Sequence, residues 1–152
     1  MCSVLLIAPH NSYRIHAYVE AAKHLDVKLV IASQSRYSLV SAVADGIKID
    51  FSDDASSLEA VLQANKKHHF QAVISTDDGG VRLAAVIAQA LGLSSNAPDS
   101  AELTRRKDLA RERLQRRGVI VPAFRVVNIT SSVESQLNQL QYLRKQPSQI
   151  LQ

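Results

Sequence analysis

Several residue types that mark particular protein classes are scarce in this sequence. Its 152 residues include one cysteine, no tryptophan and five glycines. The single cysteine, Cys2, forms no disulfide within the chain, and a zinc site built on cysteines is excluded. No apolar stretch approaches the roughly 20 residues that a membrane-spanning helix needs, and the apolar run 4–8 is too short for a secretory signal. We therefore expect a soluble, cytoplasmic protein.

Glycine-rich phosphate-binding loops are missing as well. Neither G-x-G-x-x-G nor G-x-x-x-x-G-K-[ST] occurs, which argues against a loop that wraps its backbone around a pyrophosphate. Aromatic residues occupy only 5% of positions, so the segment 105–117 lacks the aromatic interleaving that stacks on nucleic-acid bases. A nucleic-acid partner is therefore disfavoured.

The positive charge of the chain is concentrated in one segment. The formal net charge is +4, and residues 102–117 hold seven basic and three acidic side chains, which accounts for the whole excess. This placement favours a local anion-binding surface over a generally basic protein.

Apolar periodicity predicts an alternation of strands and helices. Short, continuously apolar runs are typical of strands buried on both faces of a parallel sheet, and Gly46, Gly92 and Gly118 are predicted to end helices. The expected elements are strands 3–8, 27–32, 47–49, 70–75 and 124–127 and helices 14–25, 37–44, 55–65, 80–91, 100–117 and 132–143. This order predicts an α/β fold with a Rossmann-like, doubly wound parallel sheet.

Ligands of a doubly wound sheet bind beyond the carboxyl ends of its strands, which makes three loops candidates. The first, APHNSYR at 8–14, offers Asn11 or Ser12 as a cap for the following helix. Arg14 adds a positive charge near a helix N-terminus, which itself attracts anions. This loop is either a structural bend or the border of a ligand site.

The second loop, STDDGGVR at 75–82, places Asp77 and Asp78 between a strand and a helix. Paired carboxylates can bind a metal or activate a water. Aspartates also cap helices, and Gly79 and Gly80 permit a turn. Of the two carboxylates, Asp77 is the better functional candidate because it lies nearer the strand end.

The third loop leads into the basic helix, where Lys107 and Arg111 lie four residues apart on one face. Cationic side chains at this spacing can grip phosphates. The alternative is a solvated helix with internal ion pairs, Asp108 with Arg111 and Glu112 with Arg116.

Three stretches together resemble a known family. They are LLIAPHNSYRIHAYVEAAKHL, VISTDDGGVRLAAVIAQALGLSSNAPDSAE and RKDLARERLQRRGVIVPAFRVV, in that order. The middle stretch joins an acidic strand end to a helix that closes in A-L-G-L, followed by an asparagine and a proline. The last carries R-x-x-L-x-x-x-G-V-x-V-P from Arg111 to Pro122. Over residues 3–127 the chain resembles the N-terminal, pre-ATP-grasp region of ATP-grasp carboxylate–amine ligases, the group similar to carbamoyl-phosphate synthase.

The resemblance implies an organisation in three parts. A Rossmann-like pre-ATP-grasp domain is expected at 1–98, and a basic linker helix with the start of the ATP-grasp region at 99–127. Residues 128–152 would form a tail, read as a helix end followed by a poorly structured segment, because six glutamines lie between 136 and 152.

The resemblance also implies a chemistry. ATP with Mg²⁺ activates a carboxylate as an acyl phosphate, which an amine then attacks. Lys107 and Arg111 match positions that contact the nucleotide in related enzymes, and Arg106 stands where the family typically has an aspartate.

The first two loops then become walls of a substrate cleft. Ser12 and Arg14 from the first loop and Asp77 from the second are the candidates for its border.

The family's lysine-bearing strand, glycine-rich loop and late metal ligands find no match in these 152 residues. We therefore expect no catalytic or metal-ligating residue here and no ATP turnover by the chain alone. An excised domain, a truncated product and a subunit completed by a partner chain would each fit, and a free-standing α/β module that binds a nucleotide or small anion is the alternative. An apolar face of the basic helix, formed by Leu103, Ala110 and Leu114, predicts a homo-oligomer or a partner chain.

Overall fold

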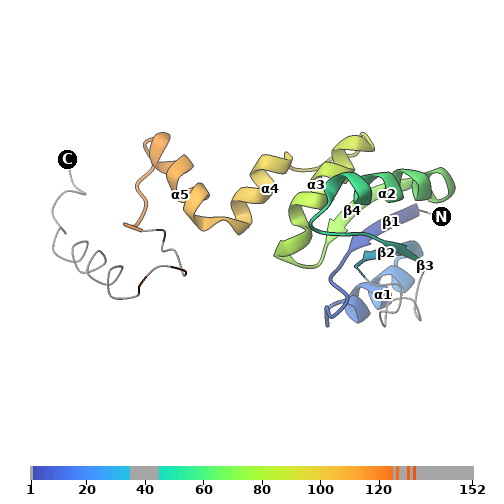
Figure 1. Cartoon of the computed structure of the whole chain (residues 1–152). Coiled ribbons are helices and arrows are strands. Elements are labelled where there is room, and N and C mark those ends of the chain that lie inside the picture. The colour runs from blue at the N-terminus through green and yellow to red at the C-terminus, as the bar shows by residue number, and fades with distance from the viewer. Residues whose placement is uncertain (1, 35–44, 125, 127–129, 131, 133–152) are drawn as a thin grey trace. The chain divides into compact units, whose positions relative to one another are not determined.

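The computed structural model describes residues 2–34, 45–124, 126, 130 and 132 (Figure 1). The predicted helices 37–44 and 132–143 and most of the predicted strand 124–127 lie outside these residues. No helix among the described residues is long and apolar enough to cross a membrane.

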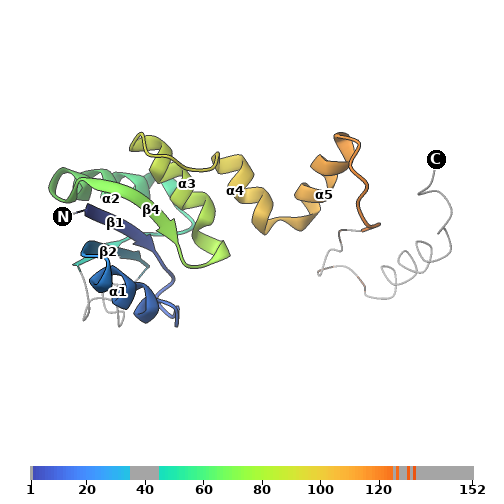
Figure 2. The ribbon, with the colours of Figure 1, turned by 180° about the vertical axis from the view of Figure 1, so that it is seen from behind.

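The chain separates into two compact units, residues 1–105 and 106–152. Within its described residues, the first unit is built on a four-stranded sheet whose strands are all parallel (Figures 1 and 2). The strands, in spatial order, are β3 Asp45–Lys48, β2 Val27–Ser33, β1 Cys2–Ile7 and β4 Phe70–Ser75. The predicted α/β fold with a parallel sheet is therefore confirmed.

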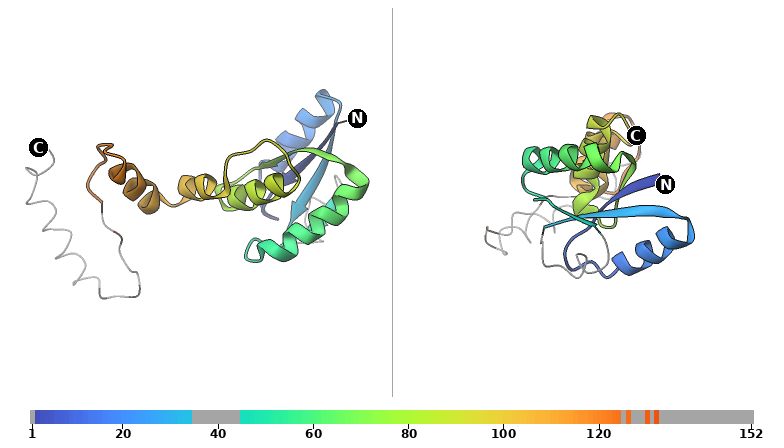
Figure 3. Two further views of the ribbon diagram at one scale, coloured as in Figure 1. Left: turned by 90° about the horizontal axis from the view of Figure 1, so that it is seen from above. Right: turned by 90° about the vertical axis from the view of Figure 1, so that its right-hand side faces the viewer.

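Helices cover both faces of this sheet. In chain order they are α1 Ile15–His24, α2 Asp54–His68, the short 3₁₀ helix η2 Asp78–Gly80, α3 Val81–Ala90 and α4 Pro98–Arg105. The right-hand view of Figure 3 shows α1, in blue, on one side of the sheet and α2, in green, on the other. This sandwich of helices around a parallel sheet is what the continuously apolar strand sequences require.

Side chains of the central strand β1 alternate between the two layers. Leu5 and Ile7 enter a core cluster with Ile87 of α3, whereas Leu6 belongs to a second cluster with Ile15 and other residues of α1. Leu5, Leu6 and Ile7 are fully buried. Burial on both faces leaves the inner strand no position for a solvent-facing polar residue, which explains its unbroken apolar run.

Two of the three predicted glycine stops are confirmed. Gly92 and Gly118 have φ of +67° and +75°, a region that disfavours other residues. After α3, the Leu93 N–H donates to the Ala88 carbonyl at 2.8 Å, as in a Schellman motif. The third, Gly46, lies within β3 instead of at a helix end, and the predicted helix 37–44 before it lies outside the described residues.

The predicted helix 100–117 is also wrong as a single element. α4 ends at Arg105, and α5 Lys107–Arg116 begins the second unit. Arg106 between them has φ −97° and ψ 85°, which is the non-helical backbone of an N-cap residue. The apolar face predicted from Leu103 to Leu114 is therefore divided between two helices.

Candidate functional site

The sheet reverses its winding between β1 and β4. The chain leaves β1 to build β2 and β3 on one side and then places β4 on the other. Ligands of open α/β sheets bind at such a point, beyond the carboxyl ends of the strands. The Thr76 N–H donates to the Ile7 carbonyl at 3.0 Å, so the two strand ends lie directly side by side.

A group of polar residues, which we term the switch-point cluster, joins the loops that follow these two strands. It consists of Ser12, Arg14, Thr76 and Asp77. The Ser12 hydroxyl donates to Asp77 Oδ2 at 3.0 Å, and the Thr76 hydroxyl donates to the same oxygen. Arg14 donates from a terminal guanidinium nitrogen to the Thr76 carbonyl at 2.8 Å. The three residues predicted to border a substrate cleft thus lie together, although more than sixty positions separate the two loops.

Arg14 is the exposed cation of this cluster. Its Nε donates to the Tyr13 hydroxyl at 3.3 Å, and its guanidinium carbon lies 5.5 Å from the centre of the Tyr13 ring. The Tyr13 oxygen and, to a smaller extent, the charge of Asp77 raise the pKa of Arg14. The guanidinium is therefore positively charged and held at the carboxyl edge of the sheet.

The predicted helix caps in these loops are wrong. α1 begins at Ile15, and its N-cap position is occupied by Arg14 without a side-chain cap bond. Ser12 lies too early to cap this helix, and its hydroxyl bonds Asp77 instead. Asp77 precedes η2 in extended backbone and makes no side-chain cap bond either. Both side chains are therefore available to a polar site.

Gly80 fits the second loop against the strand ends. A Cβ added at Gly80 would lie 2.5 Å from Ser75 Oγ and 3.0 Å from Ile7 Cγ2, whereas one at Gly79 would meet nothing within 4 Å. Neither glycine has positive φ. Close packing, rather than the backbone freedom expected from the sequence, explains the glycine at position 80.

The second unit carries the two residues predicted to contact a nucleotide. Lys107 is the first residue of α5 and is exposed. Arg111, one turn later, places its guanidinium carbon 5.4 Å from the centre of the Phe124 ring, a cation–π distance. Their role as nucleotide contacts remains a prediction.

The ion pairs of α5 agree with the sequence in part. Glu112 and Arg116 pair at 3.5 Å, as predicted. Asp108 pairs with Arg106 through two hydrogen bonds of 2.9 and 2.6 Å, not with Arg111 as predicted. This bidentate contact lowers the pKa of Asp108 to about 2.

Some polar residues at the carboxyl edge escaped the sequence analysis. Thr76 is buried and hydrogen-bonds Asp77, but it belongs to no sequence motif that would single it out. Asp54 and Arg82 form an ion pair across 28 positions. Their only sequence signal is their position: Arg82 lies in the first turn of one expected helix, and Asp54 immediately precedes another. Among the described residues, no three His, Cys, Asp or Glu side chains gather as a metal-ligand set would.

Comparison with known families gives one match to the sequence. Residues 19–95, about half of the chain, match the model of the ATP-grasp N-terminal domain. The matched segment contains Asp77, but it begins after Ser12 and Arg14 and ends before Lys107. No curated protein sequence matches the chain.

Comparison with solved structures finds the same fold in larger proteins. An L-amino acid ligase from Bacillus licheniformis aligns with a TM-score of 0.70 and 15% identity, over 95% of this chain and 42% of that one. A phosphoribosylglycinamide synthetase from Anaerococcus prevotii aligns with a TM-score of 0.62 and 17% identity, over 93% of this chain and 34% of that one. The ADP complex of an N5-carboxyaminoimidazole ribonucleotide synthetase aligns with a TM-score of 0.64 and 15% identity, over 93% of this chain and 36% of that one. The chain thus spans less than half the length of each of these structures.

Proposed function

Since the chain belongs to the ATP-grasp N-terminal domain family, we propose that it forms the substrate-facing wall of an ATP-dependent carboxylate–amine ligase. In the proposed reaction, ATP phosphorylates a carboxylate and an amine displaces the phosphate from the acyl phosphate. This activity, its substrates and the use of ATP are proposals, because the chain spans 42%, 34% and 36% of the three structures compared above.

The switch-point cluster is the observation that carries this proposal. It offers one cation, Arg14, and one carboxylate, Asp77, on neighbouring loops at the edge where α/β sheets bind ligands. A guanidinium binds carboxylates with directed N–H donors, and a carboxylate accepts hydrogen bonds from an amine. The cluster therefore suits the two reacting groups of a carboxylate–amine ligation.

ATP and Mg²⁺ enter this proposal through the family. When bound, ATP supplies the phosphoryl group that activates the carboxylate. Of this chain's residues, Lys107 and Arg111 fit phosphate contacts, because they present two positive charges one helical turn apart. We assign the metal ligands and the phosphate clamp to an ATP-grasp catalytic domain, as in the carbamoyl-phosphate synthase group. The chain alone is then inactive.

Succinate is a simple probe of the proposed substrate wall. An NMR titration of the 152-residue chain would follow the Arg14 side-chain Nε–H signal and the Thr76 and Asp77 amides. We expect these signals to shift, and Arg14→Gln to weaken succinate binding about tenfold or more. Arg116→Gln is the matched control, since it removes another exposed arginine, on α5. Unshifted Arg14 and Thr76 signals at saturating succinate would exclude the cluster from the substrate wall.

An assay of ADP release tests the proposed division of labour. The purified chain with ATP, Mg²⁺, succinate and ammonia is expected to release no ADP, because positioning and charge neutralisation of the phosphates are not supplied by this part alone. Magnesium-dependent release by the pure chain would refute that expectation.

A free-standing nucleotide-binding module is the second candidate. It is favoured by the second unit, where Arg111 and the Phe124 ring together offer a cation and an aromatic face. Calorimetry with ATP, ADP and inorganic phosphate distinguishes the two candidates. Tight binding that Lys107→Ala and Arg111→Ala abolish would favour the module, and the absence of heat would favour the wall of a larger ligase.

The proposal extends to partners and compartment. Leu109 and Leu114 of α5 are 37% and 44% exposed, which supports a further chain or domain on this helix. If light scattering shows a monodisperse monomer at high concentration, the chain does not self-associate. ATP-dependent ligation and the lack of a disulfide within the chain both suit the cytoplasm.

A further inference from the structure

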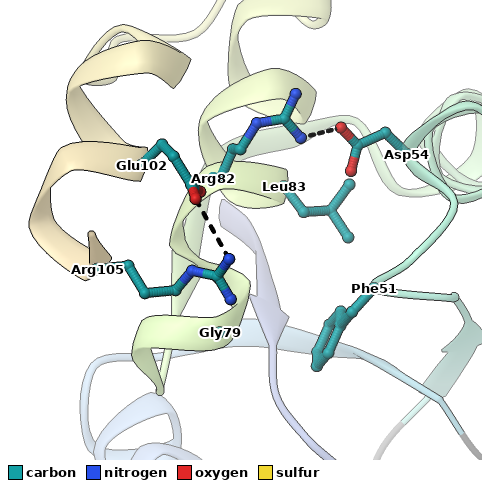
Figure 4. Close-up of a pocket in the computed structure, with 7 residues that line it drawn as sticks. All are labelled: Phe51, Asp54, Gly79, Arg82, Leu83, Glu102 and Arg105. Atoms are coloured by element: carbon teal, nitrogen blue, oxygen red, sulfur yellow. Dashed lines mark hydrogen bonds and ion pairs between the residues drawn. The ribbon is translucent and has the colours of Figure 1, made fainter. Parts of the chain in front are cut away.

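A pocket of about 320 Å³ lies at the carboxyl edge of the sheet, on the side covered by α2 and α3 (Figure 4). Its volume is at the lower end of the range for small-molecule sites. The walls come from the segment after β3, the first turns of α2 and α3, and α4. Their side chains are Phe51, Asp54, Arg82, Leu83, Glu102 and Arg105.

Two ion pairs form the polar walls of this pocket. Arg82 pairs with Asp54, and Arg105 pairs with Glu102 at 3.2 Å. The Asp54 contact raises the pKa of Arg82, and the charges of Glu102 and Asp99 raise it further. Glu102 therefore acts on Arg82 as well as on its own partner Arg105, which links the two ion pairs electrostatically.

Each guanidinium has donors to spare. Arg82 and Arg105 each contact their carboxylate through a single terminal nitrogen, whereas a guanidinium carries five N–H donors. Their side chains are 46% and 49% exposed, while those of Asp54 and Glu102 are 32% and 23% exposed. All four charged side chains of the pocket are thus partly accessible to a small ligand.

The lining favours a ligand that carries both charges. Two guanidinium groups and two carboxylates sum to no net charge, so a purely anionic ligand meets two carboxylates and a purely cationic one meets two guanidinium groups. Like charges that face each other at short range cost free energy. Phe51 and Leu83 add an apolar wall, and Leu83 is only 2% exposed.

We propose that this pocket binds a small zwitterion, an α-amino acid with an apolar side chain. The ligand carboxylate contacts Arg82 and Arg105, its ammonium group contacts Asp54 and Glu102, and its side chain lies against Phe51. The proposal goes beyond the ligase assignment and does not depend on it, because neither Arg14 nor Asp77 lines this pocket.

L-Leucine is the probe that we would use, with two analogues that each lack one charge. Leucinamide keeps the ammonium group, and 4-methylpentanoate keeps the carboxylate. The aromatic NMR signals of phenylalanine report the site, because Phe51 lines the pocket while buried Phe70 and Phe124 of the second unit serve as internal references. We expect leucine to shift Phe51 alone, and both analogues to bind about tenfold more weakly or worse.

Point variants test whether the charges of the pocket bind the ligand, as distinct from supporting the fold. Arg105→Gln and Glu102→Gln each remove one charge of the pocket from α4 and are each expected to weaken leucine binding about tenfold. Arg116→Gln and Glu112→Gln break a similar ion pair of α5 and should leave binding unchanged. Equal binding of 4-methylpentanoate and leucine, or a Phe51 signal that saturating leucine does not move, would overturn the proposal. The succinate titration of Arg14 has a separate readout, so either proposal can fail alone.

Discussion

At the scale of single residues, Asp108 shows how a neighbour sets the charge of a side chain. Its bidentate contact with Arg106 lowers its pKa to about 2, so its native pKa lies below the ordinary value of 3.8. The free energy that this ion pair contributes to folding is therefore fully present above about pH 4 and is lost as the pH falls through about 2. A carbon-detected NMR titration of the Asp108 carboxyl should give this low midpoint.

Arg106→Gln is the variant that identifies the cause of this shift. Without the guanidinium, the Asp108 midpoint should rise toward its ordinary value. Arg116→Gln, which breaks a pair that does not involve Asp108, should leave the midpoint in place. A low midpoint that survives Arg106→Gln would show that another group stabilises the carboxylate.

The close packing around Gly80 leads to a second prediction at the residue scale. Alanine there would bring its Cβ to 2.5 Å from Ser75 Oγ, so we expect Gly80→Ala to lower the free energy of unfolding by about 1–3 kcal/mol. Gly79→Ala, which meets open space, should change it by no more than about 0.5 kcal/mol. Urea unfolding measures both. If the added Ser75→Ala restores no stability to Gly80→Ala, the clash with Ser75 is not the cause.

At the scale of elements, Ser57 ties helix α2 to the segment after β3. This side chain is fully buried; its hydroxyl donates to the Asp50 carbonyl and accepts from the Asp50 N–H, both at 2.8 Å. Ser57→Ala leaves two backbone groups without these partners, so we expect a loss of about 1–3 kcal/mol in the free energy of unfolding. Exposed Ser56 in the same turn is the control. An equal response of Ser56→Ala and Ser57→Ala in urea unfolding would contradict this account.

The elements themselves were largely predictable from the sequence, because apolar periodicity reports directly which faces are buried. β4 was predicted with the bounds that the structure gives, and α3 within one residue at each end. The division of the basic helix at Arg106 was not predictable, because its cause is a backbone turn supported by a contact with Asp108. No helix-breaking residue marks the position.

The candidate site was predictable in its loops but not in its contacts. Strand order places the loops after β1 and β4 together, so Ser12, Arg14 and Asp77 could be named from sequence. The donation of two hydroxyls to one carboxylate oxygen depends on side-chain rotamers. The pair of Asp54 with Arg82 depends on how α2 packs beside α3, and neither feature leaves a spacing in the sequence.

At the scale of the whole molecule, the core belongs to the first unit. Among the described residues, every buried apolar side chain lies between Leu5 and Ala101, and α5 has none. We therefore expect a fragment of residues 1–105 to fold by itself. Its ¹H–¹⁵N NMR spectrum should superimpose on the first-unit signals of the full chain. Collapse of the signal dispersion in the fragment would show that the second unit contributes to this core.

The switch-point cluster has a consequence for the entropy of binding. The Ser12 and Thr76 hydroxyls both hold Oδ2 of Asp77, and within the described residues its other oxygen, Oδ1, accepts no hydrogen bond. The carboxylate plane is thus fixed during folding, before any ligand arrives. A ligand that donates to Oδ1 meets an acceptor whose side-chain rotamer freedom is already lost, so less of the contact energy is consumed in ordering it. Ser12→Ala and Thr76→Val would return that freedom to Asp77 and transfer the ordering cost to the binding step.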